Sequence, residues 1–181
     1  MKITGGYLKS RKINSPKGEN VRPTLSQIRE SIFSCLFSMI DFENKTFLDL
    51  FSGSGIMGFE AISRGFKYCC FVEKDKKTFF TLKENSKKLG LEDNQVKIIL
   101  GDSTKVLSKL GTDFDVIYID PPYQSGLYDI ILGGILKNNI LKDDGIIIAE
   151  HPKDIELCIK NFKVTKQKTY ADKTLTFLQK N

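Results

Sequence analysis

Two short motifs in the chain combine residue types that suit group-transfer chemistry. The first is a glycine loop, in which Gly53, Gly55 and Gly58 give the spacing G-x-G-x-x-G after the apolar run 47–51. Glycines at this spacing let a backbone turn approach a ligand closely. Glu73 ends the next apolar run, where a carboxylate can accept hydrogen bonds from ribose hydroxyls. The loop therefore predicts a cofactor that contains adenosine.

Two further carboxylates narrow the choice of cofactor. Asp49 stands beside the loop, where it would repel a pyrophosphate but attract the ammonium and sulfonium groups of S-adenosylmethionine. Asp102 follows the third apolar run, where it can accept from an adenine amino group or cap the helix expected after it. The two acids favour S-adenosylmethionine, and a nicotinamide oxidoreductase stays open as the alternative.

The second motif is Asp120-Pro121-Pro122-Tyr123, which follows the fourth apolar run. An exocyclic amine on a nucleic-acid base is a weak nucleophile, because its lone pair is delocalised into the ring. The Asp120 carboxylate and the Pro121 carbonyl can accept the two amine hydrogens and direct the lone pair at a methyl donor. Tyr123 can stack on an extruded base. The motif predicts methylation of a base amine, and the alternative interpretation is a strand-end turn with an exposed acid.

Alternating apolar runs and helical stretches are expected to bring these motifs together. The apolar runs lie at 47–51, 68–72, 96–100, 116–119 and 146–149, and the helical stretches near 25–40, 56–64, 75–89, 103–109, 126–137 and 153–160. This alternation predicts an α/β, Rossmann-like fold with a mostly parallel sheet and helices on both faces. Two further strands near 162–170 and 174–179 predict a C-terminal antiparallel hairpin. Because the first and fourth strands of such a sheet are neighbours, the two motifs should face each other.

The chain begins with a basic segment. Its net charge is +6, and residues 1–30 carry seven Lys or Arg against two Glu. We interpret residues 1–24 as a short basic arm ahead of a catalytic domain at 25–181, an arrangement that suits a polyanionic partner. A solvated tail is the alternative. The side chains expected to contact nucleic acid are Lys9, Arg11, Lys12, Arg22 and Arg29.

Composition excludes several other classes of protein. With 181 residues, 40% of them hydrophobic and 28% charged, the chain fits one domain with a sizeable core. No apolar run reaches the roughly 20 residues of a membrane helix, and no secretory signal is evident, which predicts a cytoplasmic protein. The four cysteines form no Cys-x-x-Cys pair and His151 is the only histidine, which predicts free thiols and no metal site. Nothing in the sequence requires more than a monomer.

Taken together, these motifs resemble those of a known family. With Gly5-Gly6, Arg22-Pro23-Thr24 and the stretch Ile28–Phe33, the chain is similar to the bacterial small-subunit ribosomal RNA guanine-N2 methyltransferases, the RsmD family. The resemblance covers nearly the whole chain. It implies a class I S-adenosylmethionine-dependent methyltransferase that modifies one guanine of 16S ribosomal RNA in an assembled or partly assembled small ribosomal subunit.

The resemblance also implies a division of roles among the residues of the two motifs. The positions that match the family's cofactor site are Asp49, Gly53, Gly55, Glu73 and Asp102, and those that match its base site are Asp120, Pro121 and Tyr123. One departure lies in the final hairpin, where Ala171 follows Tyr170 and family members usually have a glycine.

Two further functions stay open at the level of sequence. A methyltransferase of adenine N6 or cytosine N4, on DNA or another RNA, would share the Asp-Pro-Pro-Tyr motif. A non-catalytic RNA-binding factor for ribosome assembly would keep the fold without turnover.

Overall fold

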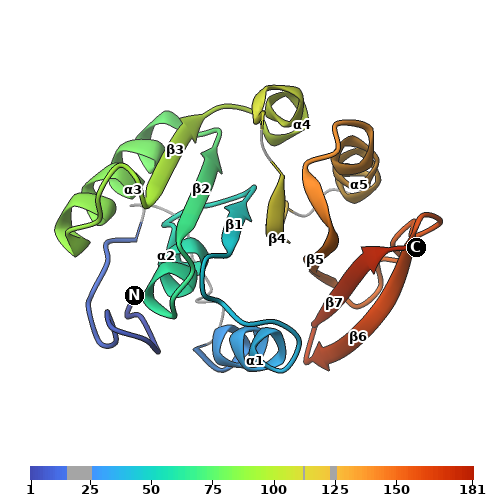
Figure 1. Cartoon of the computed structure of the whole chain (residues 1–181), viewed down its shortest axis with the longest axis horizontal. Helices are drawn as coiled ribbons and strands as arrows, with labels where there is room; N and C mark the ends of the chain where they lie inside the picture. Colours follow the sequence, from blue (N-terminus) through green and yellow to red (C-terminus); the bar gives the residue numbers. More distant parts are fainter. Residues whose placement is uncertain (16–25, 112, 123–125) are drawn as a thin grey trace.

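A seven-stranded sheet with helices on both faces forms the centre of the molecule (Figure 1). The computed structural model describes residues 1–15, 26–111, 113–122 and 126–181. The helices are α1 (Ser26–Phe37), α2 (Ile56–Ser63), α3 (Lys76–Leu89), α4 (Ser103–Val106) and α5 (Leu127–Lys137). The strands are β1 (Thr46–Asp49), β2 (Tyr68–Glu73), β3 (Val96–Leu100), β4 (Phe114–Ile119), β5 (Leu141–Pro152), β6 (Phe162–Tyr170) and β7 (Lys173–Lys180).

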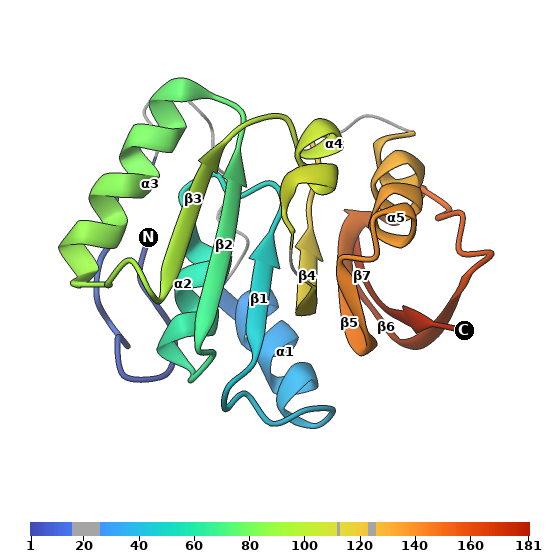
Figure 2. The ribbon, with the colours of Figure 1, turned by 45° about the horizontal axis from the view of Figure 1, so that its top comes forward.

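The order of the strands creates a switch point at the middle of the sheet. The order is β3-β2-β1-β4-β5-β7-β6, and β1 pairs in parallel with both β2 and β4 (Figure 2). The chain therefore builds outward in one direction from β1 and in the other from β4, which is where open α/β sheets bind ligands. At the far edge β7 runs antiparallel between β5 and β6. The predicted mostly parallel sheet with a C-terminal antiparallel hairpin is confirmed.

The central strands are apolar on both sides because each side packs against helices. Phe47 belongs to a buried cluster with side chains of α1, α2 and α3, whereas its neighbour Leu48 belongs to a second cluster with α4 and α5. In Figure 1 the helices α1 and α2 lie below the sheet, and α4 and α5 lie above it. This two-sided burial is typical of parallel strands in α/β proteins and explains their continuous apolar runs.

One predicted helix does not form. Residues 153–160 were expected to be helical, but they contain no helix and connect β5 to β6 as an irregular segment. Ile155, Leu157 and Ile159 are half-buried, whereas the residues between them are exposed. This alternation has the period of an extended chain, which is two residues, and not the period of a helix. The stretch 103–109 is helical but divides into α4 and a 3₁₀ turn, Leu107–Lys109.

The described part of the basic arm packs against the domain. Ile3, Leu8 and Ile13 are 2%, 5% and 3% exposed and belong to the same buried cluster as α2 and α3. The arm folds back on itself through a bridge between Lys2 and Lys12. Residues 16–24 of the predicted arm lie outside the described residues.

A buried asparagine ties the arm to the glycine loop. The Asn85 side chain on α3 accepts a hydrogen bond from the Asn14 amide at 2.8 Å and donates to the Asn14 carbonyl at 3.0 Å. It also donates to the Ser54 carbonyl in the glycine loop at 3.0 Å. One side chain therefore fixes the position of the arm relative to the loop.

Among the described residues, no helix is both long enough and apolar enough to span a membrane.

Candidate active site

Carboxylates gather at the carboxyl ends of the strands beside the switch point. Asp49 ends β1, Glu73 ends β2 and Asp120 follows β4. Glu73 and Asp120 both repel the Asp49 carboxylate strongly enough to help raise its pKa, so the three groups share one region. The fold thus brings together acids that the sequence assigned separately to the cofactor and to the target base.

The glycine loop leaves room for a ligand on one side and packs tightly on the other. Gly53 has a φ of 52°, and a Cβ placed on it would meet no atom within 4 Å. Gly55 has a φ of 83°, and its Cβ would lie 2.2 Å from the Leu82 Cδ1 on α3. Both positions favour glycine because L side chains rarely adopt positive φ. The space beside Gly53, just before α2, is therefore open, whereas Gly55 is closely packed.

Asp49 is a buried acid with an unsatisfied oxygen. The residue is 1% exposed, and among the described residues its Oδ1 has no hydrogen-bond partner. Burial raises its pKa to about 8, and repulsion by Glu73 and Asp120 adds to this, while backbone hydrogen bonds from Phe51 and Gly58 oppose it. An unpaired buried carboxylate fits a cationic group such as an ammonium and would repel a pyrophosphate.

Glu73 is held in a fixed orientation by backbone amides. Its Oε2 accepts from the Gly53 amide at 2.9 Å, and its Oε1 accepts from the Asp75 amide at 2.7 Å. A carboxylate oxygen can accept more than one hydrogen bond, so each oxygen keeps capacity for a ligand hydroxyl. The link to Gly53 joins the acid expected at the ribose to the loop expected beneath the cofactor.

Asp102 caps helix α4, which confirms one of the two interpretations of this residue. Its Oδ1 accepts from the Thr104 amide at 3.0 Å and the Thr104 hydroxyl at 2.7 Å, and its Oδ2 lies 3.0 Å from the Lys74 Nζ. The hydrogen bonds from Thr104 and Lys74 lower the pKa of Asp102 to about 2. The side chain is therefore a fixed carboxylate at neutral pH, which leaves a contact with adenine as a prediction.

Asp120 directly follows β4, at the strand end where the sequence predicted the site of the target base. Burial and the nearby Glu150 carboxylate raise its pKa to about 7, whereas the Lys173 ammonium, 3.8 Å from its Oδ2, opposes this rise. Pro121 is buried next to it. Tyr123, the third residue of the predicted base site, lies outside the described residues.

The basic side chains expected to contact RNA divide into two groups. Lys9, Arg11 and Lys12 are exposed on the arm, although Arg11 also donates to the Lys88 carbonyl at 2.9 Å. Arg22 lies outside the described residues. The arm thus presents three cationic side chains to solvent from a backbone that is anchored to the domain.

Arg29 differs from the expectation. It is 3% exposed, its Nε lies 3.2 Å from the Glu60 Oε1, and its Nη2 donates to the Lys2 carbonyl at 2.9 Å. Glu60 is fully buried on α2 and also pairs with Arg64. A phosphate cannot reach a guanidinium that is buried in this way, so Arg29 joins α1 to α2 and the arm and is not an RNA contact.

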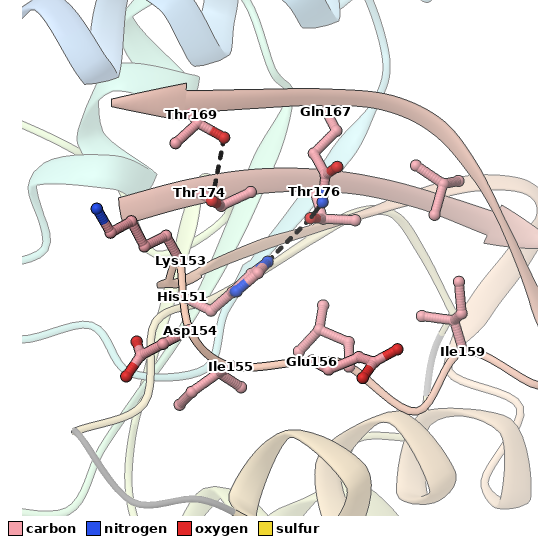
Figure 3. A pocket seen from close by; sticks show the side chains of 12 residues that line it. His151, Lys153, Asp154, Ile155, Glu156, Ile159, Gln167, Thr169, Thr174 and Thr176 are labelled. Carbon is pink, nitrogen blue, oxygen red and sulfur yellow. Dashed lines mark hydrogen bonds between the residues drawn. The ribbon is translucent and has the colours of Figure 1, made fainter. Parts of the chain in front are cut away.

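His151 lies away from the strand-end acids, on the other face of the sheet. Its Nε2 is 2.9 Å from the Thr176 hydroxyl and its Nδ1 is 2.9 Å from the Pro152 carbonyl. Figure 3 shows it among the side chains that line a hollow between β6, β7 and the segment 153–159. The volume of this hollow is about 410 Å³. The described residues contain no group of three His, Cys, Asp or Glu side chains that could hold a metal ion.

Two residues near Asp120 were not identified by sequence reasoning. Glu150 is fully buried at the end of β5, and Lys173 at the start of β7 contacts both Glu150 and Asp120. The available signal was the position of Glu150 directly after an apolar run, which matches the position of Asp120. No local signal marks Lys173, because a tertiary pairing places it there.

Comparison with known proteins identifies relatives over nearly the whole chain. A family model described as "Conserved hypothetical protein 95" matches residues 1–179. Ribosomal RNA small subunit methyltransferase D of Buchnera aphidicola subsp. Acyrthosiphon pisum is 38% identical over 168 residues, with 92% of this chain and 86% of that protein covered. The protein of the same name from Haemophilus influenzae is 33% identical over 172 residues, with 93% and 88% covered.

Solved structures show the same similarity in three dimensions. The Escherichia coli protein yhhF, named as a candidate methyltransferase, superimposes with a TM-score of 0.88 at 25% identity and covers 100% of this chain and 98% of its own. The Haemophilus influenzae protein HI0767, named as a candidate methylase, gives a TM-score of 0.85 at 30% identity, with 99% and 98% covered. By sequence and by fold, the chain belongs to the RsmD family of ribosomal RNA small subunit methyltransferases.

Proposed function

We propose that the protein transfers a methyl group from S-adenosylmethionine to the exocyclic N2 amine of one guanine in 16S ribosomal RNA. The observation that carries this proposal is the pair of acids at the switch point. Asp49 is buried and unsatisfied beside the glycine loop, and Asp120 lies beyond the end of the adjacent strand, close enough to influence the charge on Asp49. This arrangement separates a site for a cationic cofactor from a site for an amine.

The cofactor side of the cleft consists of the glycine loop and its neighbouring acids. S-adenosylmethionine, when bound, supplies an electrophilic methyl group on a sulfonium centre. Asp49 would attract the positive charge of that cofactor, and Gly53 offers an open backbone cradle. Glu73, held by two amides, would accept from the ribose hydroxyls, and the fixed carboxylate of Asp102 would accept from the adenine amine.

The base side of the cleft consists of Asp120, Pro121 and Tyr123. The Asp120 carboxylate and the Pro121 carbonyl would accept hydrogen bonds from the two hydrogens of the guanine amine and so direct its lone pair at the methyl donor. A pKa of about 7 suits Asp120 to take the amine proton near neutral pH, because a general base works best close to its own pKa. Tyr123 would stack on the extruded base.

The substrate would be a small ribosomal subunit or a partly assembled form of it. Support comes from the names of the two curated relatives and from the three exposed cations of the arm. Cationic side chains supply affinity for the phosphate backbone and leave the choice of base to the cleft.

The proposal is tested by incubating the protein with labelled S-adenosylmethionine and small subunits from cells that lack its gene. We expect label in N2-methylguanosine after digestion of the 16S RNA to nucleosides. Label in N6-methyladenosine or N4-methylcytidine would show that the protein methylates a base other than the proposed guanine. Binding of S-adenosylmethionine with no label on subunits would show that the small subunit is not the substrate.

A further inference from the structure

The strand next to Asp120 carries a second acid at the equivalent position. β4 and β5 run in parallel with Ile119 opposite Ala149, so Asp120, which follows β4, and Glu150, which lies in β5, come next to each other in the register. Glu150 is fully buried, whereas Asp120 is partly exposed. Two neighbouring carboxylates at one sheet edge repel each other, and each needs a compensating charge to stay ionised.

Lys173 supplies that charge from a different strand. Its Nζ forms an ion pair with the Glu150 Oε1 and lies 3.8 Å from the Asp120 Oδ2. The second oxygen of Glu150 accepts a hydrogen bond from the Tyr118 hydroxyl at 2.6 Å. Both oxygens of Glu150 are therefore held, and Glu150 in turn holds the ammonium of Lys173 next to Asp120.

The hairpin is what brings this lysine to the cleft. β7 pairs antiparallel with β5, with Lys173 opposite Pro152, so the first residue after the turn meets the last residues of β5. A parallel strand at this place would put its carboxyl end there instead. The antiparallel direction of β7 therefore places Lys173 beside Glu150 and Asp120.

The charges around Asp120 come from three other elements. Glu150 on β5 is the acid whose charge raises the pKa of Asp120, Asp49 at the end of β1 is a second nearby acid, and Lys173 on β7 is the described cation that contacts Asp120. The Tyr118 hydroxyl on β4 faces Glu150 and is neutral, because burial and the adjacent acids raise its pKa. Without the lysine, Asp120 would have no cation among these groups to offset the charge of Glu150.

We propose that Lys173, held by Glu150, is a positioning residue that keeps the Asp120 carboxylate ionised and oriented for its work on the target amine. This proposal rests on the role of Asp120 in the function proposed above. Lys173 touches neither the cofactor nor the base in this scheme and acts only through Asp120.

The test compares two variants that differ only in the lysine. Glu150→Gln removes the repelling acid but keeps Lys173, whereas Glu150→Gln with Lys173→Met removes both members of the Glu150–Lys173 ion pair, so that neither is left buried without the other. The pH dependence of the single-turnover methyl transfer rate is measured at saturating S-adenosylmethionine. In Glu150→Gln, we expect the midpoint of the rise in rate with pH to lie at lower pH than in the native protein. In the double variant, we expect this midpoint to lie at least half a pH unit higher than in Glu150→Gln.

A direct titration of Asp120 separates this proposal from the proposed function. The Asp120 carboxyl signal is followed by carbon NMR in aspartate-labelled protein without substrate and is assigned with Asp120→Asn. We expect the titration midpoint of Asp120 to shift in the two variants in the same directions as the midpoint of the rate. Because no substrate is present, this measurement stays valid even if the protein fails to methylate subunits. Lys180→Met is the matched control, because Lys180 is on the same strand but pairs with the exposed Asp143, and we expect no shift.

The proposal would be overturned if Glu150→Gln and the double variant had equal midpoints, both in the pH dependence of the rate and in the NMR titration of Asp120. A loss of thermal stability with unchanged midpoints would also overturn it, because it would show that Lys173 has only a structural role. Lys173→Arg keeps the charge and should keep the midpoint of the native protein.

Discussion

At the scale of single residues, the two acids beside the switch point lie in different environments. Asp49 is 1% exposed with an oxygen that has no partner among the described residues, and Asp120 is partly exposed and lies 3.8 Å from the Lys173 Nζ. Burial raises the pKa of both, to about 8 for Asp49 and about 7 for Asp120. Two acids with different environments can serve two different partners, one a cationic cofactor and the other an amine.

Cofactor binding should release a proton from Asp49. At pH 6.5 to 7 the free protein keeps Asp49 mostly protonated, because its pKa is about 8. A bound cation favours the carboxylate, so binding should release up to about one proton per site and tighten as the pH rises. Calorimetry of S-adenosylmethionine binding in buffers of different ionisation enthalpy measures this number directly.

Asp49→Asn is the matched control for the proton release. The amide keeps the shape of the side chain and cannot ionise, so proton release should vanish and affinity should fall by at least tenfold. If the native protein binds S-adenosylmethionine without releasing a proton, Asp49 does not meet the cation.

At the scale of elements, the sequence predicts the strand ends and the C-terminal hairpin, but not the order in which the two hairpin strands join the sheet. Asp49, Glu73 and Asp120 each follow an apolar run, and parallel strands bring their carboxyl ends to one edge, so these acids could be placed together from the pattern alone. Lys173 could not be placed, because its position depends on β7 inserting between β5 and β6.

The two errors at this scale have physical causes. The helix expected at 153–160 followed from the alternation of strands and helices, although Ile155, Leu157 and Ile159 alternate at the period of an extended chain. Arg29 was expected to contact phosphates, with a surface or helix-packing role as the alternative. Its burial depends on Glu60, a partner 31 residues away that local sequence does not reveal.

Asn85 should couple the stability of the arm to that of the glycine loop. Asn85→Ala removes two hydrogen bonds to Asn14 and one to the Ser54 carbonyl, and the last is buried. An unpaired buried polar group costs about 1–3 kcal/mol, so the free energy of unfolding should fall by roughly 2–3 kcal/mol. Urea denaturation measures this loss, and S-adenosylmethionine affinity should fall with it.

The control for Asn85 is Glu84→Ala on the neighbouring, exposed position of the same helix. This variant should unfold at the same urea concentration as the native protein. A loss of stability in Asn85→Ala with unchanged cofactor affinity would show that the arm and the loop are not coupled.

At the scale of the whole molecule, the cations proposed to bind RNA lie on the N-terminal arm, apart from the acids proposed to bind the cofactor and the target base. The exposed cations of the arm lie on a backbone that is packed into the core through Ile3, Leu8 and Ile13. The arm is therefore not a solvated tail over its described length. Its cations are held in place relative to the cleft, which suits a substrate whose target base must reach Asp120.

Removing three charges from the arm should weaken RNA binding and flatten its dependence on salt. For Lys9→Ala/Arg11→Ala/Lys12→Ala, the slope of log affinity against log salt should decrease in magnitude by about 2–3, because each phosphate contact contributes about 0.7–0.9. Filter binding to small subunits at several salt concentrations measures the slope.

A triple variant elsewhere serves as the control for net charge. Lys105, Lys109 and Lys160 are exposed and distant from the arm in the sequence. Replacing them with alanine removes the same charge and should leave the slope nearly unchanged. Equal slopes for the two triple variants would show that the arm makes no specific contribution.

The most direct test of the central claim is the single-turnover rate of methyl transfer by Asp120→Ala, with S-adenosylmethionine affinity measured on the same sample. The account predicts that transfer to small subunits falls by at least a thousandfold while the cofactor dissociation constant stays within about threefold of the native value, because Asp120 acts on the target amine and Asp49 on the cofactor. Loss of cofactor binding together with the rate would place Asp120 on the cofactor side of the cleft and contradict the account.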